Sequence, residues 1–199
     1  MTRDPGYASP SGADYRIEEL LVEQATSSVD PHVRRYSLYL LGRERDPHLK
    51  GLFLSALRDT DKGARAQAMA ALADLGDTVV PDLISLLLDN DWKVRYRAAE
   101  ALGKIRNRES VKALIEALSD EKDHVRYMAA KALGGTEDKG AVPPLIDRLG
   151  DGNMYVRKAA VLSLGKLGDT PGRAAVRKLL DSERTDMVCE AIRSVLSGE

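Results

Sequence analysis

The stretch Val94–Gly103, VRYRAAEALG, decides the fold because near-copies of it return at a fixed interval along the chain. The other copies are VRRYSLYLLG from Val33, ARAQAMAALA from Ala64, VRYMAAKALG from Val125, VRKAAVLSLG from Val156 and MVCEAIRSVL from Met187. Successive starts lie 31, 30, 31, 31 and 31 residues apart. A constant period through six copies is the signature of a protein built from stacked repeats.

Each repeat contains two helical patterns. In ESVKALIEALSD, the apolar residues Val111, Leu114, Ile115 and Leu118 have the spacing of one buried helical face. The quoted stretch carries a second stripe of the same kind, and turn-forming segments such as DND, DEKD and DGN separate the two. We therefore predict a first and a second helix in every repeat.

Three columns of equivalent residues support this reading. One column holds the predicted N-caps of the second helices, namely Asp30, Asp61, Asp91 and Asn153. Another precedes the first helices, namely Asp46, Asp77, Asn107, Asp138 and Asp169. Small residues form the third, namely Gly42, Ala73, Gly103, Gly134 and Gly165. Small side chains at matching positions let neighbouring helices approach closely, so the repeats are expected to stack.

The predicted fold is an all-α solenoid, a right-handed superhelix of six two-helix repeats of about 31 residues. Residues 14–199 are expected to form one repeat domain, preceded by a mobile tail over residues 1–13, which are rich in Pro, Gly and Ser. That tail lacks the apolar core of a signal peptide, and no apolar run is long enough to cross a bilayer. The single Cys189 excludes an internal disulfide. We predict a cytoplasmic protein.

The recurrent pattern D…VR…AA.ALG, clearest from Asp91 to Gly103, resembles the short HEAT-like repeats of the phycobilisome lyase type. The resemblance covers most of the chain and implies the solenoid fold. The family includes chromophore lyases, a di-iron deoxyhypusine hydroxylase and proteins that only bind others, so the resemblance alone does not choose an activity.

Catalytic and metal-binding signatures are absent from the sequence. The family's hydroxylase holds iron through His-Glu pairs, but none of His32, His48 and His124 precedes a Glu. Cys189 has no His in its own repeat or the one before, so no base is at hand to form a thiolate. We predict a protein that is not an enzyme, with no catalytic residue, no metal and no cofactor. A lyase that depends on groove shape remains an alternative.

An arginine column follows the start of five second helices: Arg34, Arg65, Arg95, Arg126 and Arg157. One interpretation is a ladder that binds phosphates. The other is structural, because acidic residues recur six residues before an arginine, at Asp59, Asp89, Asp120 and Asp151. In similar HEAT-like repeats such pairs bridge adjacent repeats and satisfy loop carbonyls. We favour the structural role.

The remaining face of the second helices is predicted to be a concave binding surface. It carries more basic than acidic residues, together with tyrosines, which are enriched at binding hot spots. The predicted partner-binding residues are Arg35, Tyr36, Tyr39, Tyr96, Arg97, Tyr127, Met128, Lys131 and Lys158.

We therefore expect a non-catalytic interaction scaffold that binds a protein or peptide of acidic or mixed charge. Nucleic acid binding along the basic face is the less favoured alternative, because the chain as a whole carries a net charge of -1. A modifying enzyme of the lyase type is the third. No membrane partner is expected, and the sequence leaves the partner, the oligomeric state and the curvature open.

Overall fold

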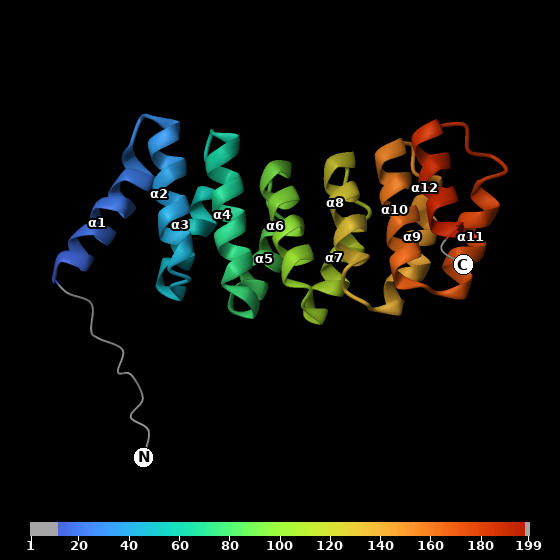
Figure 1. Cartoon of the computed structure of the whole chain (residues 1–199), viewed down its shortest axis with the longest axis horizontal. Helices are drawn as coiled ribbons and strands as arrows, with labels where there is room; N and C mark the ends of the chain where they lie inside the picture. The colour runs from blue at the N-terminus through green and yellow to red at the C-terminus, as the bar shows by residue number, and fades with distance from the viewer. Residues whose placement is uncertain (1–11, 198–199) are drawn as a thin grey trace, which may run out of the picture. The chain divides into compact units, whose positions relative to one another are not determined.

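The computed structural model describes residues 12–197, which form twelve α-helices joined by short turns and contain no strand (Figure 1). The first helices of the six repeats are α1 (Gly12–Ser27), α3 (Lys50–Ala56), α5 (Val80–Leu86), α7 (Val111–Ala117), α9 (Val142–Asp147) and α11 (Thr170–Leu179). The second helices are α2 (Pro31–Arg43), α4 (Lys62–Asp74), α6 (Trp92–Ile105), α8 (Asp123–Leu133), α10 (Met154–Leu167) and α12 (Asp186–Leu196). The prediction of an all-α solenoid built from helix pairs is confirmed.

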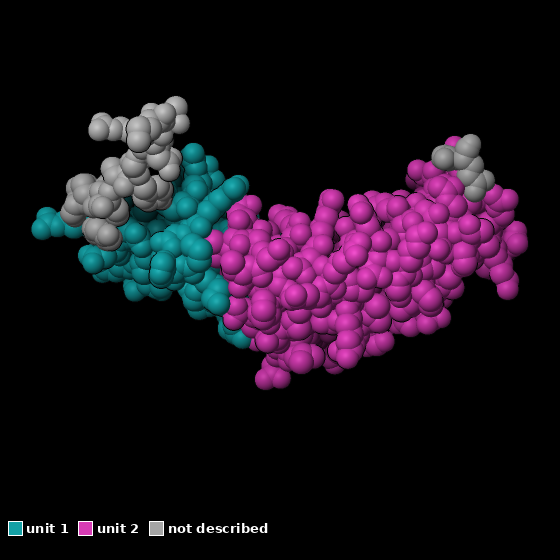
Figure 2. Space-filling model, turned by 90° about the horizontal axis from the view of Figure 1, so that it is seen from below, with its two compact units in different colours: residues 1–71 teal, residues 72–199 magenta. Residues whose placement is uncertain are grey.

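Two compact units divide the chain, a first unit of residues 1–71 and a second unit of residues 72–199 (Figure 2). The expected tail, residues 1–13, lies outside the described residues except for Gly12 and Ala13, which begin α1. That residues 14–199 form a single domain stays a prediction.

In the second unit the second helices form one layer. α6 packs on α8, α8 on α10, and α10 on α12, while each first helix packs against the second helix of its own repeat. Leu102, Leu133 and Leu164 occupy one column of the repeat and are all fully buried. Because each helix pair covers only part of its apolar surface, the neighbouring repeat completes the core.

The predicted caps of the second helices are confirmed. Asp30 accepts a hydrogen bond from the backbone N–H of His32 at 2.8 Å, and Asn153 accepts one from Tyr155 at 2.8 Å. Asp91 and Asp61 cap α6 and α4 in the same way. These bonds satisfy backbone donors that the first turn of a helix leaves without a partner.

The second Asx column precedes the first helices, as predicted, but most of its members are separated from the α-helix by a 3-10 turn. Asp46, Asn107 and Asp138 cap short 3-10 turns, Pro47–Leu49, Arg108–Ser110 and Lys139–Ala141, which precede α3, α7 and α9. Asp77 lies inside another such turn, Gly76–Val79, and Asp169 precedes α11 without a side-chain cap. A 3-10 turn is tighter than a turn of α-helix and reverses the chain within three or four residues. The Asx residues that cap these turns therefore lie one turn before the α-helix.

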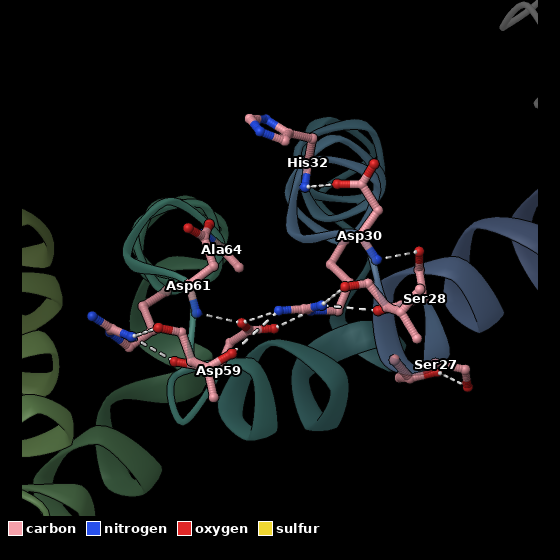
Figure 3. A network of polar contacts seen from close by, with 12 residues as sticks. Ser27, Ser28, Asp30, His32, Asp59, Asp61 and Ala64 are labelled. Atoms are coloured by element: carbon pink, nitrogen blue, oxygen red, sulfur yellow. Dashed lines mark hydrogen bonds and ion pairs between the residues drawn. The ribbon is translucent and has the colours of Figure 1, made fainter.

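The structural reading of the arginine column is confirmed. We call each contact between such an arginine and an acidic side chain of the next repeat an arginine rung. In the first unit, Arg34 donates from Nε and Nη2 to both carboxylate oxygens of Asp59, at 2.7 and 2.8 Å (Figure 3). In the second unit, the rungs are Arg95–Asp120, Arg126–Asp151 and Arg157–Glu183.

The remaining guanidinium nitrogen of each rung binds the chain's own loop. Nη1 of Arg126 donates to the carbonyl oxygen of Asp120 at 2.9 Å, and Nη1 of Arg95 donates to that of Asp89 at 2.8 Å. The rung therefore joins two repeats and fixes the loop between the helices of one repeat. The guanidinium groups of these arginines already bind carboxylates and carbonyl oxygens of the protein itself. They are therefore not free to bind phosphates, and the phosphate-ladder interpretation is wrong.

Glu183 completes the last rung, and the sequence pattern missed it because it is a Glu outside the Asp column. Hydrogen bonds from Arg157 lower the pKa of Glu183 from 4.5 to about 2, against the opposing effect of burial and with help from the backbone N–H of Thr185. A carboxylate whose folded pKa is depressed contributes stability that is complete above the ordinary pKa and lost as the pH falls towards the folded pKa.

We therefore expect the stability advantage of the protein over Glu183→Gln to shrink between about pH 5 and pH 2. The amide that replaces the Glu183 carboxylate in the variant cannot titrate. As the pH falls, the variant therefore loses only the stability contributed by the carboxylates of the other rungs. Urea denaturation of both proteins across this range, followed by circular dichroism, measures the difference. A constant difference at every pH would contradict the assigned role of Glu183.

Candidate partner-binding surface of the second helices

The structure places several predicted binding residues on neighbouring helices of the second unit. Tyr96 on α6, Tyr127 on α8 and Lys158 on α10 share one position of the repeat and are partly exposed. Lys131, one turn after Tyr127, is exposed. Since α6, α8 and α10 lie side by side, these side chains belong to one surface, which we call the second-helix surface (Figure 1).

Met128 does not belong to this exposed surface. Its side chain is buried, with 4% of the residue exposed, and the equivalent Ala159 is 5% exposed. The equivalent position in α2, Tyr36, is 65% exposed. α8 has a packed neighbour on each side, so a position at the edge of its apolar stripe is covered. The sequence prediction placed this edge position among the exposed ones, and for Met128 that placement was wrong.

Arg97 is present on this side of α6 but is already engaged. Its Nη1 lies 2.5 Å from Oε2 of Glu100, and only 12% of the Arg97 side chain is exposed. The guanidinium also lies over the ring of Tyr96, 5.3 Å from its centroid. Burial raises the pKa of the Tyr96 hydroxyl. Arg97, Tyr96 and Glu100 therefore form a cluster within one helix, in which the charge of Arg97 is neutralised.

The first unit holds the other three predicted residues on α2. Tyr36 and Tyr39 are 65% and 44% exposed, and their rings meet edge to face with centroids 6.0 Å apart. Arg35 is partly exposed, and its Nη2 lies 2.6 Å from Nδ1 of His32. These two tyrosines are available to a partner, but they stabilise each other as a pair.

The structure adds a hollow that the sequence did not reveal. It has a volume of about 390 Å³ and lies between the first turns of α8 and α10. It is lined by Asp123, His124, Tyr127, Asn153 and Tyr155. One of the predicted residues, Tyr127, is thus part of a built cavity.

Hydrogen bonds organise the polar side of the hollow. The side-chain amide of Asn153 donates to Oδ2 of Asp123, and Nδ1 of His124 lies 2.7 Å from Oδ1 of the same carboxylate. Burial raises the pKa of Asp123, but these bonds together hold it below its usual value. The imidazole of His124 also contacts the indole of Trp92 on α6, with ring centroids 5.0 Å apart. The aromatic surface therefore extends over α6, α8 and α10.

A sequence signal for the hollow did exist. His124 and Tyr155 stand one residue before the start of the repeated motif, three residues before Tyr127 and Lys158. Residues three apart on a helix share one face, so each pair extends the second-helix surface towards the helix N-terminus. The sequence prediction treated His124 as an unremarkable, partly exposed residue rather than a metal ligand, and it did not connect His124 with its aromatic neighbours.

Three further features bear on other kinds of site in the part of the chain that the structure describes: metal-ligand clusters, Cys189 and membrane-spanning helices. Among these residues, no three His, Cys, Asp or Glu side chains lie together as metal ligands would. Cys189 is partly buried, with its Sγ 3.7 Å from the carbonyl oxygen of Glu183. None of the helices described has the length and apolar character needed to span a membrane.

The geometry defines a class of protein: an all-α solenoid of helix-pair repeats with an aromatic and basic surface on its second helices. The chain belongs to the family of HEAT repeats, whose model matches residues 18–91, 80–153 and 112–197. This agrees with the HEAT-like resemblance found in the sequence. No curated protein matches the chain by sequence.

Solved structures share the fold. In the complex of CpcE and CpcF of phycocyanin lyase from Nostoc sp. PCC7120, a chain is 24% identical with a TM-score of 0.72, covering 76% of this chain and 99% of its own. Human deoxyhypusine hydroxylase is 23% identical with a TM-score of 0.53, covering 92% of this chain and 74% of its own. A designed armadillo repeat protein in complex with the peptide (KR)4 is 20% identical with a TM-score of 0.53, covering 89% of this chain and 97% of its own. At these sequence identities, the similarity shows a shared fold and nothing about activity.

Proposed function

We propose that the protein is a non-catalytic interaction scaffold that binds a protein or peptide partner on its second-helix surface. The observation that carries the proposal is the hollow beside Tyr127, because stacking of the repeats does not require an aromatic cavity at the helix ends. Buried core residues and arginine rungs account for most positions that recur from repeat to repeat in this chain. The partly exposed tyrosines and the hollow are what remains for a partner.

The charge of the surface favours acidic groups on part of the partner. Lys104, Lys131 and Lys166 are exposed on α6, α8 and α10, where they create positive potential along the second helices. Tyrosine and basic residues together are typical of protein interfaces. We therefore infer a partner of mixed charge, with acidic residues opposite these lysines.

Proteins of the same fold support this type of function. The CpcE and CpcF structure is a complex of proteins, and the armadillo repeat protein was solved with a bound peptide. Helix-pair solenoids offer extended surfaces that suit such partners. The cytoplasmic location expected from the sequence, like the absence of catalysis, stays a prediction.

A double variant tests the proposal. We expect Tyr127→Ala with Lys131→Glu to lower partner capture by about tenfold or more, since it removes an aromatic contact and reverses an exposed charge. The measurement is a quantitative pull-down from native cells with the tagged protein. Lys112→Glu is the matched control, because Lys112 is an exposed lysine on the first helix α7. Thermal unfolding of both variants should stay close to that of the original protein.

The outcome separates the alternatives. Equal capture by the variant and the control would refute the proposed surface. Capture of nucleic acid that disappears steeply with added salt would instead favour binding through phosphate contacts. A coloured preparation, or a bound chromophore seen by absorbance, would favour the lyase alternative.

A further inference from the structure

We propose that the hollow between α8 and α10 receives an arginine side chain of the partner protein. This inference rests on the proposed function, because the hollow is part of the second-helix surface. It goes further by assigning the chemistry of one contact. Elsewhere on the surface, the exposed lysines favour acidic groups of the partner. An arginine bound in the hollow would then fix the position of a partner of mixed charge along the surface.

The walls of the hollow are aromatic. Tyr127 and His124 come from α8, and Tyr155 comes from the first turn of α10. Tyr155 is 52% exposed, so its ring is accessible from solvent. Trp92 backs His124 from the adjacent helix. The face of an aromatic ring carries negative potential, and a planar guanidinium can stack on it.

Asp123 brings a negative charge to the lining of the hollow, and its side chain is 38% exposed. Asp123 is held ionised by its hydrogen bonds, as its lowered pKa indicates. Oδ1 of Asp123 accepts from both the backbone N–H and Nδ1 of His124, whereas Oδ2 accepts from the amide of Asn153 and has capacity for another hydrogen bond. An arginine would therefore find a charge-assisted acceptor, Oδ2 of Asp123, in the same lining as the rings.

Other guests fit less well. The side-chain amide of Asn153 already donates to Asp123, and the backbone N–H of Tyr155 already donates to Asn153. These two donors in and beside the lining are therefore not available to an acidic guest. An acidic guest would meet the Asp123 carboxylate and be repelled. A neutral apolar guest would cover the same carboxylate without replacing the hydrogen bonds of water, which costs free energy.

The size of the hollow agrees with a single long side chain. Its volume of about 390 Å³ is at the small end for ligand pockets, which are usually about 300–1,000 Å³, and leaves room for one long side chain of a partner. Arginine is preferred over lysine because its flat head matches the ring faces and can bond to the carboxylate with two N–H groups.

A fluorescent reporter lies next to the lining of the hollow. Trp92 is the single tryptophan of the chain, and its ring contacts His124. We would titrate the full chain with N-acetyl-arginine amide, and in parallel with the amides of N-acetyl-glutamate, N-acetyl-phenylalanine and N-acetyl-lysine. Trp92 fluorescence and the amide NMR signals of the first turns of α8 and α10 report binding.

We expect saturation with the arginine probe at millimolar concentration and about tenfold weaker binding of the acidic and aromatic probes. Asp123→Asn keeps the shape of the side chain and removes its charge, and Tyr155→Ala removes an exposed wall. Each should weaken arginine binding by about tenfold, whereas Tyr155→Phe and the distant-site control Tyr36→Ala should not.

Several results would overturn the inference. They are the absence of saturation by arginine, binding of the glutamate or phenylalanine probe as strong as that of arginine, and unchanged binding in Asp123→Asn. Circular dichroism must show that both variants keep the helix content of the original protein. Because the probes need no partner, failure here combined with partner loss in Tyr127→Ala with Lys131→Glu would reject the arginine pocket and leave the proposed function standing.

Discussion

Asp151→Ala is expected to lower the free energy of unfolding by about 3 kcal/mol, although Asp151 lies in a loop. Its side chain is 4% exposed and accepts hydrogen bonds from Nε and Nη2 of Arg126, at 2.8 and 2.9 Å. Burial raises the pKa of Asp151, yet the bonds from Arg126 and from the backbone N–H of Asn153 hold it below its usual value. Removing the carboxylate would leave a largely buried guanidinium without its counter-ion.

A double-mutant cycle isolates the rung itself. Arg126→Ala is also destabilising, but the double variant should lose less than the sum of the two single changes, because neither partner remains orphaned. Glu121→Ala, in the equivalent loop of the preceding repeat, is the control for an exposed acidic side chain: Glu121 is 73% exposed and lies 3.6 Å from Nη2 of Arg95 and 3.8 Å from Nζ of Lys122. That control should cost less than about 1 kcal/mol.

Urea denaturation gives the change in unfolding free energy, and hydrogen exchange shows where it acts. In a repeat protein stability passes between nearest neighbours, so amides of α8 and α10 should lose protection before those of α6. Strict additivity of Arg126→Ala and Asp151→Ala would show that the two side chains act independently and that the rung is not the unit of stabilisation.

Much of the fold could be predicted because its determinants recur. A side chain repeated every 31 residues, such as Leu102, Leu133 and Leu164, must have the same role in each copy, so one reading of the pattern serves all repeats. The caps and rungs followed from the same logic. Glu183 escaped it because a longer acidic side chain, one residue out of register, performs the task of the Asp column.

The binding surface could be predicted only in part, because surface properties do not repeat. Helical geometry placed Tyr127 and Lys131 on an accessible face, but it could not show that neighbouring helices cover Met128. It also could not show that Glu100 engages Arg97, since rotamer choice decides that contact. The hollow depends on side chains from α8 and α10 together, and such pairs across repeats are invisible to the pattern of a single helix.

Close approach of the second helices leads to the last expectation, that Gly134→Ala destabilises the protein by about 2–3 kcal/mol. A methyl group on Gly134 would lie 2.6 Å from Cβ and 2.8 Å from Cα of Ser163, and the backbone atom cannot move away by rotation of a side chain. Ser163 is itself held by a hydrogen bond of 2.7 Å from its hydroxyl to the buried carbonyl oxygen of Ala130. The added methyl must therefore push α8 and α10 apart.

Two further variants distinguish this clash from a general effect of replacing glycine. Gly51→Ala in α3 meets no atom within 4 Å and should instead stabilise the protein by about 0.5–1 kcal/mol, because alanine is the better helix former. Adding Ser163→Gly to Gly134→Ala should restore part of the loss, since it removes two of the three clashing atoms but not Cα. Urea denaturation measures all four proteins. If Gly134→Ala were as stable as the original chain, the small-residue column would not set the distance between α8 and α10.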